Sequence, residues 1–257
     1  MKIVIDIETI PDQREGARQS FIDQAINEFK APSSLTKTQA AEALGLSKEE
    51  AKPYSADQLK MLWVEMRATE EGEKKGIEAW RKTALDGTKG QVFSFAITEV
   101  NSGIMFSDYS LNERKLLESF NRFLAMICSK DSAGSVLTPL FVGHNVANFD
   151  LKFLFRRFVI NGIRPACLLN FAGRHGVHYF DNSIAWCGHK EYISQDNLCK
   201  ALGIEGKPDD IDGSKVWDYV EAGKYEQVLK YNEDDVMKAE AIYNRLTFSD
   251  SALVESC

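Results

Sequence analysis

The chain is poor in the residues that build disulfide frameworks and zinc sites. It has five cysteines and four histidines in 257 residues. The cysteines form no CxxC pair, and an odd, scattered set is typical of reduced thiols in a cytoplasm. Two short candidates for zinc are Cys187-Gly-His189 and His175-x-x-His178. Neither has a second pair at ligand spacing, so zinc is disfavoured.

Long apolar runs are also missing. No run approaches the roughly 20 residues that a bilayer requires. Lys2 is followed by only three apolar residues before Asp6, which is not the pattern of a secretory signal. A hydrophobic content of 44% and a charged content of 27% are typical of a soluble globular protein. We therefore expect a cytoplasmic protein with no membrane partner and a substantial core.

The chain also lacks an excess of positive charge. The chain has 31 Lys and Arg against 38 Asp and Glu, and its net charge is −7. Generic duplex-binding proteins are basic, because phosphate contacts dominate their affinity. The charge therefore argues against a protein that coats DNA. It leaves open a nuclease that takes only a strand end, because bound divalent metals would offset an acidic site.

The apolar patterns predict a mixed α/β protein. Residues 2–9 alternate around Ile3, Ile5 and Ile7, as a half-buried strand does. Further strands are expected at residues 91–100 and 103–110, paired as a hairpin, and at 139–142 and 177–180. Helices are expected at residues 113–127, around 151–159, and at 196–202, 215–221 and 225–246. This order predicts early antiparallel strands and later strands joined by crossovers.

Residues 11–90 differ in character from the rest. They are polar and rich in Ala, Glu, Lys and Gln, and we expect several short helices punctuated by residues such as Gly72. Residues 36–47 resemble the first half of a helix-turn-helix, but the next helix would be acidic and end at Pro53. A small helical lobe is therefore favoured over duplex recognition. We expect a single domain over residues 1–248, with a core of 1–10 and 91–248, an insertion at 11–90, and a tail at 249–257.

Two carboxylates stand on the first expected strand, in the segment VIDIET. Residues two apart on a strand share a face, so Asp6 and Glu8 point the same way. Two carboxylates about 7 Å apart along a strand can share one hard cation or flank two. For an isolated Asp-x-Glu, a solvated strand face is the more ordinary interpretation.

Two later segments carry similar chemistry. In residues 143–150, GHNVANFD, Asp150 stands at a helix start just past an apolar strand. Polar residues at the carboxyl end of a strand are where α/β sheets place their sites. In residues 231–235, YNEDD, Tyr231 and Asp235 are four apart on one helix face, and a phenol there can orient a water molecule. Alone, each has a structural explanation, as a helix-start charge or as an amphipathic helix.

Taken together, the three segments resemble the DEDD exonuclease superfamily. Asp-x-Glu-Thr, Asn-x-x-x-Phe-Asp and Tyr-x-x-x-Asp stand here in its order, and the third motif resembles that of its tyrosine subgroup. The sequence resembles in particular the exonuclease domain of family-B DNA polymerases and the related stand-alone exonucleases, often carried by phages and prophages. Residues 197–204, NLCKALGI, and 212–217, DGSKVW, also resemble the stand-alone group. The resemblance covers residues 1–10 and about 90–248.

The resemblance implies a ribonuclease H-like fold: a mixed five-stranded sheet flanked by helices. It also implies two-metal hydrolysis with Mg²⁺ or Mn²⁺. In that scheme Asp6, Glu8 and Asp235 would hold one metal ion. Asp6 would bridge to a second ion supported by Asp150, and Tyr231 would orient the attacking water.

The implied activity is 3′→5′ exonucleolytic release of nucleoside 5′-monophosphates from single-stranded DNA. Thr9 would touch the terminal nucleotide, Asn145 would face the substrate, and Phe149 is a near-site residue expected to pack from below. Three alternatives stay open: an enzyme that trims RNA, a catalytically silent replication accessory, and a nuclease that works only with a partner. That partner, a replication or recombination protein, would dock on residues 11–90.

Basic residues give weaker signals. The apolar stripe of the helix around 151–159 is expected at Leu151, Leu154, Phe155, Phe158 and Val159. Arg156 and Arg157 fall opposite this stripe, so we expect them on a solvated face. Arg174 and Lys190 are better candidates for phosphate contacts. Residues 209–213 are acidic and are expected to form a connection.

Overall fold

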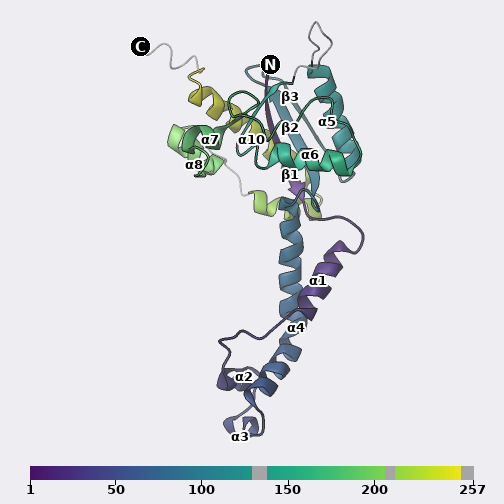
Figure 1. The fold of residues 1–257 in the computed structure, drawn as a ribbon, viewed down its shortest axis with the longest axis vertical. Helices are drawn as coiled ribbons and strands as arrows, with labels where there is room; N and C mark the ends of the chain where they lie inside the picture. Colours follow the sequence, from purple (N-terminus) through teal and green to yellow (C-terminus); the bar gives the residue numbers. More distant parts are fainter. Residues whose placement is uncertain (129–137, 206–211, 250–257) are drawn as a thin grey trace. The chain divides into compact units, whose positions relative to one another are not determined.

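The computed structural model describes residues 1–128, 138–205 and 212–249. The chain forms two compact units. One unit, the core, joins Met1–Ile10 to the chain from Leu85 onward, and the other, the lobe, is Pro11–Ala84 (Figure 1). Residues 209–211 of the expected connection at 209–213 lie outside the described residues. So do residues 250–257 of the expected tail at 249–257.

The core is built on a five-stranded sheet with the strand order β3-β2-β1-β4-β5. The strands are β1 (Lys2–Ile10), β2 (Gln91–Glu99), β3 (Met105–Tyr109), β4 (Leu140–Gly143) and β5 (Tyr179–Asp181). β1, β2 and β3 pair antiparallel, whereas β1, β4 and β5 pair parallel. The predicted mixed, ribonuclease H-like sheet is confirmed.

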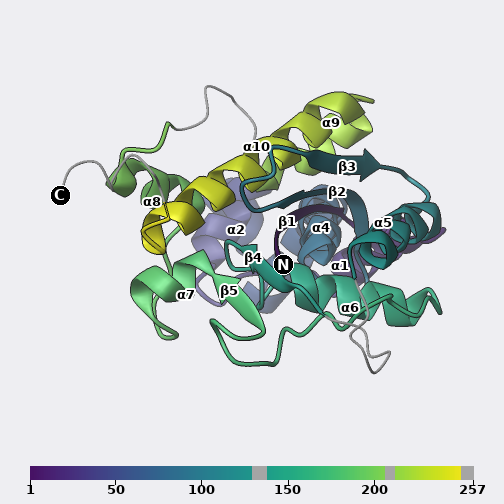
Figure 2. The same ribbon diagram turned by 90° about the horizontal axis from the view of Figure 1, so that it is seen from above.

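Helices cover both faces of this sheet (Figure 2). The three that matter most are α5 (Glu113–Ile127), α6 (Asp150–Ile160) and α10 (Tyr225–Leu246). Ile3, Ile5 and Ile7 of β1 are buried in one cluster with residues of α5 and α6. Val4 is buried on the opposite face, against Val236 of α10. Alternation along β1 therefore directs its even-numbered side chains toward α10.

Helix α6 buries only part of the apolar stripe that its sequence predicts: Leu151, Leu154 and Phe158 are buried as expected. Phe155 and Val159 are 42% and 63% exposed, whereas Arg157 is buried. Arg157 donates from Nε and Nη2 to the two carboxylate oxygens of Glu113, at 2.8 and 2.7 Å. The prediction of a solvated Arg157 is wrong, because a carboxylate on α5 satisfies the guanidinium inside the protein.

The described residues between β5 and α10 include three helices and a 3₁₀ turn. They form α7 (Asn182–Cys187), α8 (Gln195–Leu202) and α9 (Val216–Glu221), with the 3₁₀ turn at Gly213–Lys215. Helix α7 was not predicted. Asp181 starts it, because its carboxylate accepts hydrogen bonds from the backbone N–H groups of Ser183 and Ile184.

The lobe contains one long helix rather than only short ones. Its elements are α1 (Ala17–Asn27), α2 (Lys37–Ala43), α3 (Lys48–Ala51), α4 (Ala56–Arg81) and a 3₁₀ turn at Lys82–Leu85. Gly72 does not interrupt α4, contrary to the prediction. A Cβ at Gly72 would lie 2.8 Å from Cα of Ile26, and one at Gly76 would lie 2.5 Å from Cα of Ile22. The two glycines let the backbones of α1 and α4 approach closely.

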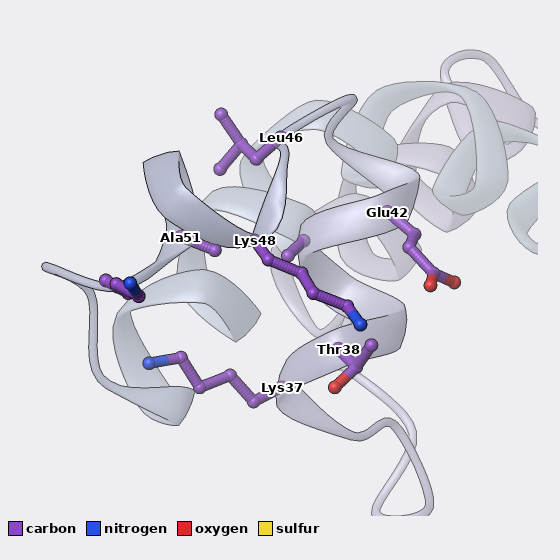
Figure 3. A pocket seen from close by; sticks show the side chains of 8 residues that line it. Lys37, Thr38, Glu42, Leu46, Lys48 and Ala51 are labelled. Carbon is purple, nitrogen blue, oxygen red and sulfur yellow. The ribbon is translucent and has the colours of Figure 1, made fainter.

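The second half of the lobe packs α2 and α3 on the start of α4, around buried Ala40, Ala41, Ala51 and Leu59. Helix α3 has four residues, too few to lie along a major groove as a recognition helix. A pocket of about 150 Å³ lies between α2 and α3 (Figure 3). It is lined by Lys37, Thr38, Ala41, Glu42, Leu46, Lys48, Ala51 and Lys52. None of these is a predicted site residue.

Candidate active site

Three of the predicted carboxylates lie close together between β1 and α10. Asp6 and Glu8 of β1 and Asp235 of α10 each place one oxygen within 4.8 Å of the others. Among the described residues, this is the one group of three or more acidic, His or Cys side chains that could hold a metal ion. Carboxylate oxygens this close repel one another, and hard divalent cations such as Mg²⁺ or Mn²⁺ favour such ligands. The donor set therefore fits a divalent metal.

Strand and helix packing fixes this geometry. Asp6 and Glu8 lie on the face of β1 that carries Val4, and Val4 packs against Val236, the neighbour of Asp235. β1 has a register shift between Glu8 and Thr9, and Glu8 pairs with Ser94 of β2. Glu8 and Thr9 are only 9% and 8% exposed, whereas Asp6 and Asp235 are half-buried, so the acidic group is only partly shielded from water.

Tyr231 lies one helical turn before Asp235. Burial, together with the charges of Glu8, Asp235 and Asp6, raises the pKa of its phenol well above the usual value of 10. The phenol therefore stays protonated in the physiological range. Its hydroxyl forms a hydrogen bond with Asp235, and a carboxylate can only accept. Tyr231 is thus held as a hydrogen-bond donor at the edge of the acidic group.

Asp150 lies close by but in a different setting. Its side chain is buried, and its Oδ1 accepts a hydrogen bond of 3.1 Å from the backbone N–H of Ile7, between the two carboxylates of β1. Burial raises the pKa of Asp150 well above its usual range, and the charges of Asp181 and Asp235 add to this. Asp150 is not one of the three converging carboxylates. In this structure it ties the start of α6 to β1.

The turn between β4 and α6 places the remaining predicted residues. A Cβ at Gly143 would lie 2.9 Å from the carbonyl oxygen of Ile5, which explains a glycine where β4 ends. Asn145 follows with a left-handed φ of 60°, and its side-chain oxygen accepts a hydrogen bond from Asn148 at 3.2 Å. Phe149 is half-buried and packs against Phe153, with ring centroids 5.6 Å apart.

Residues 107–256 match a family described as predicted 3′-5′ exonucleases related to the exonuclease domain of PolB, and the match covers more than half of the chain. The chain belongs to this family. The resemblance inferred from the three motifs is confirmed, and it makes the protein a predicted nuclease. The matched part of the chain holds Asp150, Tyr231 and Asp235, whereas Asp6 and Glu8 precede it. No curated protein is significantly similar to the chain.

Several residues that the motifs did not indicate contact Asp6 or Asp235 of the acidic group. Asn232 donates to Oδ2 of Asp6 at 2.6 Å. Gln195 donates to the carbonyl oxygen of Asp235 at 2.9 Å, and Nζ of Lys238 lies 3.9 Å from Oδ1 of Asp235. Asn232 and Lys238 are visible in the sequence only as polar residues on an amphipathic helix. Gln195 comes from a separate helix, so no local pattern points to it.

Asp181 is a further acidic residue that the motifs did not indicate. It ends β5 beside Gly143 of β4 and is fully buried. Its carboxylate accepts a 3.0 Å hydrogen bond from the backbone N–H of Asn145, besides those from the start of α7. Its position at the carboxyl end of a parallel strand is the signal that could have indicated it. Asp181 thus joins the Asn145 turn to β5.

The other sequence candidates lie apart from this group. Neither zinc candidate contributes to a set of three possible ligands within the described parts of the chain. Instead, Nε2 of His175 hydrogen-bonds the carbonyl oxygen of Asp181, and Nδ1 of His178 accepts from the N–H of Arg174. The side chains of Arg174 and Lys190 are exposed, and their phosphate contacts stay predictions. None of the described helices has the length and apolar character needed to cross a bilayer.

Proposed function

We propose that this protein is a metal-dependent 3′→5′ exodeoxyribonuclease that releases nucleoside 5′-monophosphates from single-stranded DNA ends. The observation that carries the proposal is the convergence of Asp6, Glu8 and Asp235 beside the protonated Tyr231. Membership of a family of predicted 3′-5′ exonucleases supports the reaction class and its polarity.

The proposed cofactors are two divalent ions, Mg²⁺ or Mn²⁺. When bound, they would stabilise negative charge on the attacking and leaving oxygens of the phosphodiester. Asp6, Glu8 and Asp235 would hold the first ion. Asp6, with Asp150, would hold the second. The clustered oxygens and their mutual repulsion support this assignment, because a cation lowers the cost of keeping all of them ionised.

The other site residues act on water and substrate in this proposal. Because the hydroxyl of Tyr231 donates its one proton to Asp235, its oxygen accepts a hydrogen bond from the attacking water and orients that water for in-line attack on phosphorus. Thr9 and its backbone contact the terminal nucleotide, and Asn145 faces the substrate from the turn after β4. Phe149 supports this turn through its contact with Phe153.

Single-stranded DNA is the proposed substrate because the protein has no excess of positive charge with which to hold a duplex. With a net charge of −7, it gains little energy from phosphate contacts. Fraying a duplex end costs a few kcal/mol that such contacts would have to offset. The lobe is proposed to select substrates or to dock a replication or recombination protein.

The test uses 5′-labelled DNA and RNA of equal sequence, each with Mg²⁺, Mn²⁺ or EDTA. We expect stepwise shortening of single-stranded DNA and 3′ overhangs from the 3′ end, with metal only. Blunt duplex should be a poor substrate, and circular single strands should resist. Rapid nicking of circular strands would show an endonuclease and overturn the proposal. A preference for RNA would change the substrate but keep the site.

A further inference from the structure

Two hydrogen bonds in series connect Ser94 to Asp6 through the side chain of Asn232. Ser94 of β2 donates from Oγ to Oδ1 of Asn232 at 3.1 Å, and Nδ2 of Asn232 donates to Oδ2 of Asp6 at 2.6 Å. Ser94 and Asn232 are both fully buried. This series of hydrogen bonds therefore runs from β2 through α10 to β1, and joins the three elements that surround the acidic group.

The direction of each hydrogen bond follows from chemistry. A carboxylate only accepts, so the amide group of Asn232 must turn its NH₂ toward Asp6. Its oxygen then faces Ser94, whose hydroxyl must donate. No other arrangement satisfies both contacts, so the plane of the Asp6 carboxylate is set by a group that is itself fixed.

We propose that Asn232, held by Ser94, is a positioning residue that orients Asp6 for metal binding. This inference rests on the proposed function, because it needs Asp6 to be a metal ligand. Residues that hydrogen-bond a metal ligand fix its orientation, and losing one costs about 10- to 100-fold in metal affinity or activity. A carboxylate that is already oriented also loses less conformational freedom when the ion binds.

Asn244 offers a matched control on the same helix. It is 9% exposed, and its Nδ2 donates to Oδ1 of Asn101 at 2.9 Å. Its position is 12 residues after Asn232, or about 18 Å along α10 at 1.5 Å per residue. Replacing either asparagine with leucine removes a part-buried hydrogen bond of its amide group, but only one of these bonds reaches a carboxylate of the acidic group.

The experiment compares Asn232→Leu, Ser94→Ala, their combination and Asn244→Leu in the full chain. Mn²⁺ binding is measured by calorimetry, and cleavage of single-stranded DNA is measured against metal concentration. Asn232→Leu should weaken Mn²⁺ binding about 10- to 100-fold. Ser94→Ala should weaken it less, and the double variant should add little to Asn232→Leu, because both act through one series of hydrogen bonds. Asn244→Leu should lower stability and leave metal binding unchanged.

Two results would overturn the inference while leaving the proposed function intact. One is parental Mn²⁺ affinity in folded Asn232→Leu, and the other is an equal loss of affinity in Asn244→Leu. If Asn232→Leu does not fold, Ser94→Ala carries the same test, and parental affinity in it has the same meaning. A parental protein that neither binds Mn²⁺ nor shortens DNA would overturn the proposed function and this inference with it.

Discussion

At the scale of single residues, the acidic group works against folding when no cation is present. Asp6→Asn should therefore abolish cleavage and stabilise the metal-free protein by on the order of 1 kcal/mol, because it removes one charge beside Glu8 and Asp235. Urea unfolding in EDTA and the DNA assay in Mg²⁺ measure the two effects. Near-normal activity of the variant in Mg²⁺ would contradict the assignment of Asp6.

The raised pKa of Asp150 should make the stability of the metal-free protein depend on pH. The pKa of this residue in the folded protein is raised above the ordinary 3.8 by burial, so the unfolded chain loses this proton at a lower pH than the folded protein does. Stability of the metal-free protein should therefore fall as the pH rises from about 4 through the raised folded pKa. Asp150→Asn keeps an acceptor for the N–H of Ile7 and should flatten this decline. Identical pH slopes of the urea midpoint in both proteins would refute the prediction.

Tyr231 is predicted to affect rate rather than metal binding. Tyr231→Phe keeps the ring and removes the hydroxyl that would orient water, so we expect kcat to fall about 10- to 100-fold. The apparent affinity for Mn²⁺ should stay close to that of the parent, unlike in Asp235→Ala, which removes a proposed ligand. A loss of metal affinity as large as that of Asp235→Ala would mean that Tyr231 has a different role.

At the scale of elements, Asp181 holds the turn of the second motif on β5. Asp181→Ala leaves the backbone N–H groups of Asn145 and Ser183 without their acceptor, so unfolding should need about 3 kcal/mol less. Asp212→Ala is the matched control, because this carboxylate also caps a turn, at Ser214, but is exposed. We expect that variant to lose about 1 kcal/mol or less. Equal losses of unfolding free energy in the two variants, measured by urea unfolding, would show that Asp181 acts only as a helix cap.

The elements also show what the sequence could and could not predict. Periodicity predicted α5 and α10 with their observed bounds, and the alternation of β1 separated Ile5 and Ile7 from the carboxylates. The buried face of α6 was predicted only in part, because Arg157 is buried against a carboxylate of another helix. The prediction that Gly72 separates two short helices was wrong for a similar reason, since the role of this glycine depends on the contact between α4 and α1. Ser94 and Asn232 meet across 138 residues, so no local pattern could connect them.

At the scale of the whole molecule, the chain leaves the sheet at the end of β1 and returns to it at β2. Ile10 pairs with Gln91, so the chain departs and re-enters at neighbouring positions of one antiparallel pair. The lobe, Pro11–Ala84, is thus inserted where a short hairpin connection would suffice. Ile10 and Phe93 lie together in a cluster with Val216 and Val228, which removal of the lobe leaves in place.

We therefore predict that the core binds metal without the lobe. A variant in which a linker of about four residues joins Ile10 to Leu85 keeps Gly87, whose carbonyl oxygen lies 3.4 Å from Nη1 of Arg157. It should fold and bind Mn²⁺ like the parent, because Asp6, Glu8 and Asp235 all belong to the core. Its relative rates on single strands, 3′ overhangs and blunt duplex should change, because the lobe is proposed to select among them. A folded variant that degrades all three substrates at parental rates would show that the lobe takes no part in substrate choice, and partner docking would be left as its proposed role.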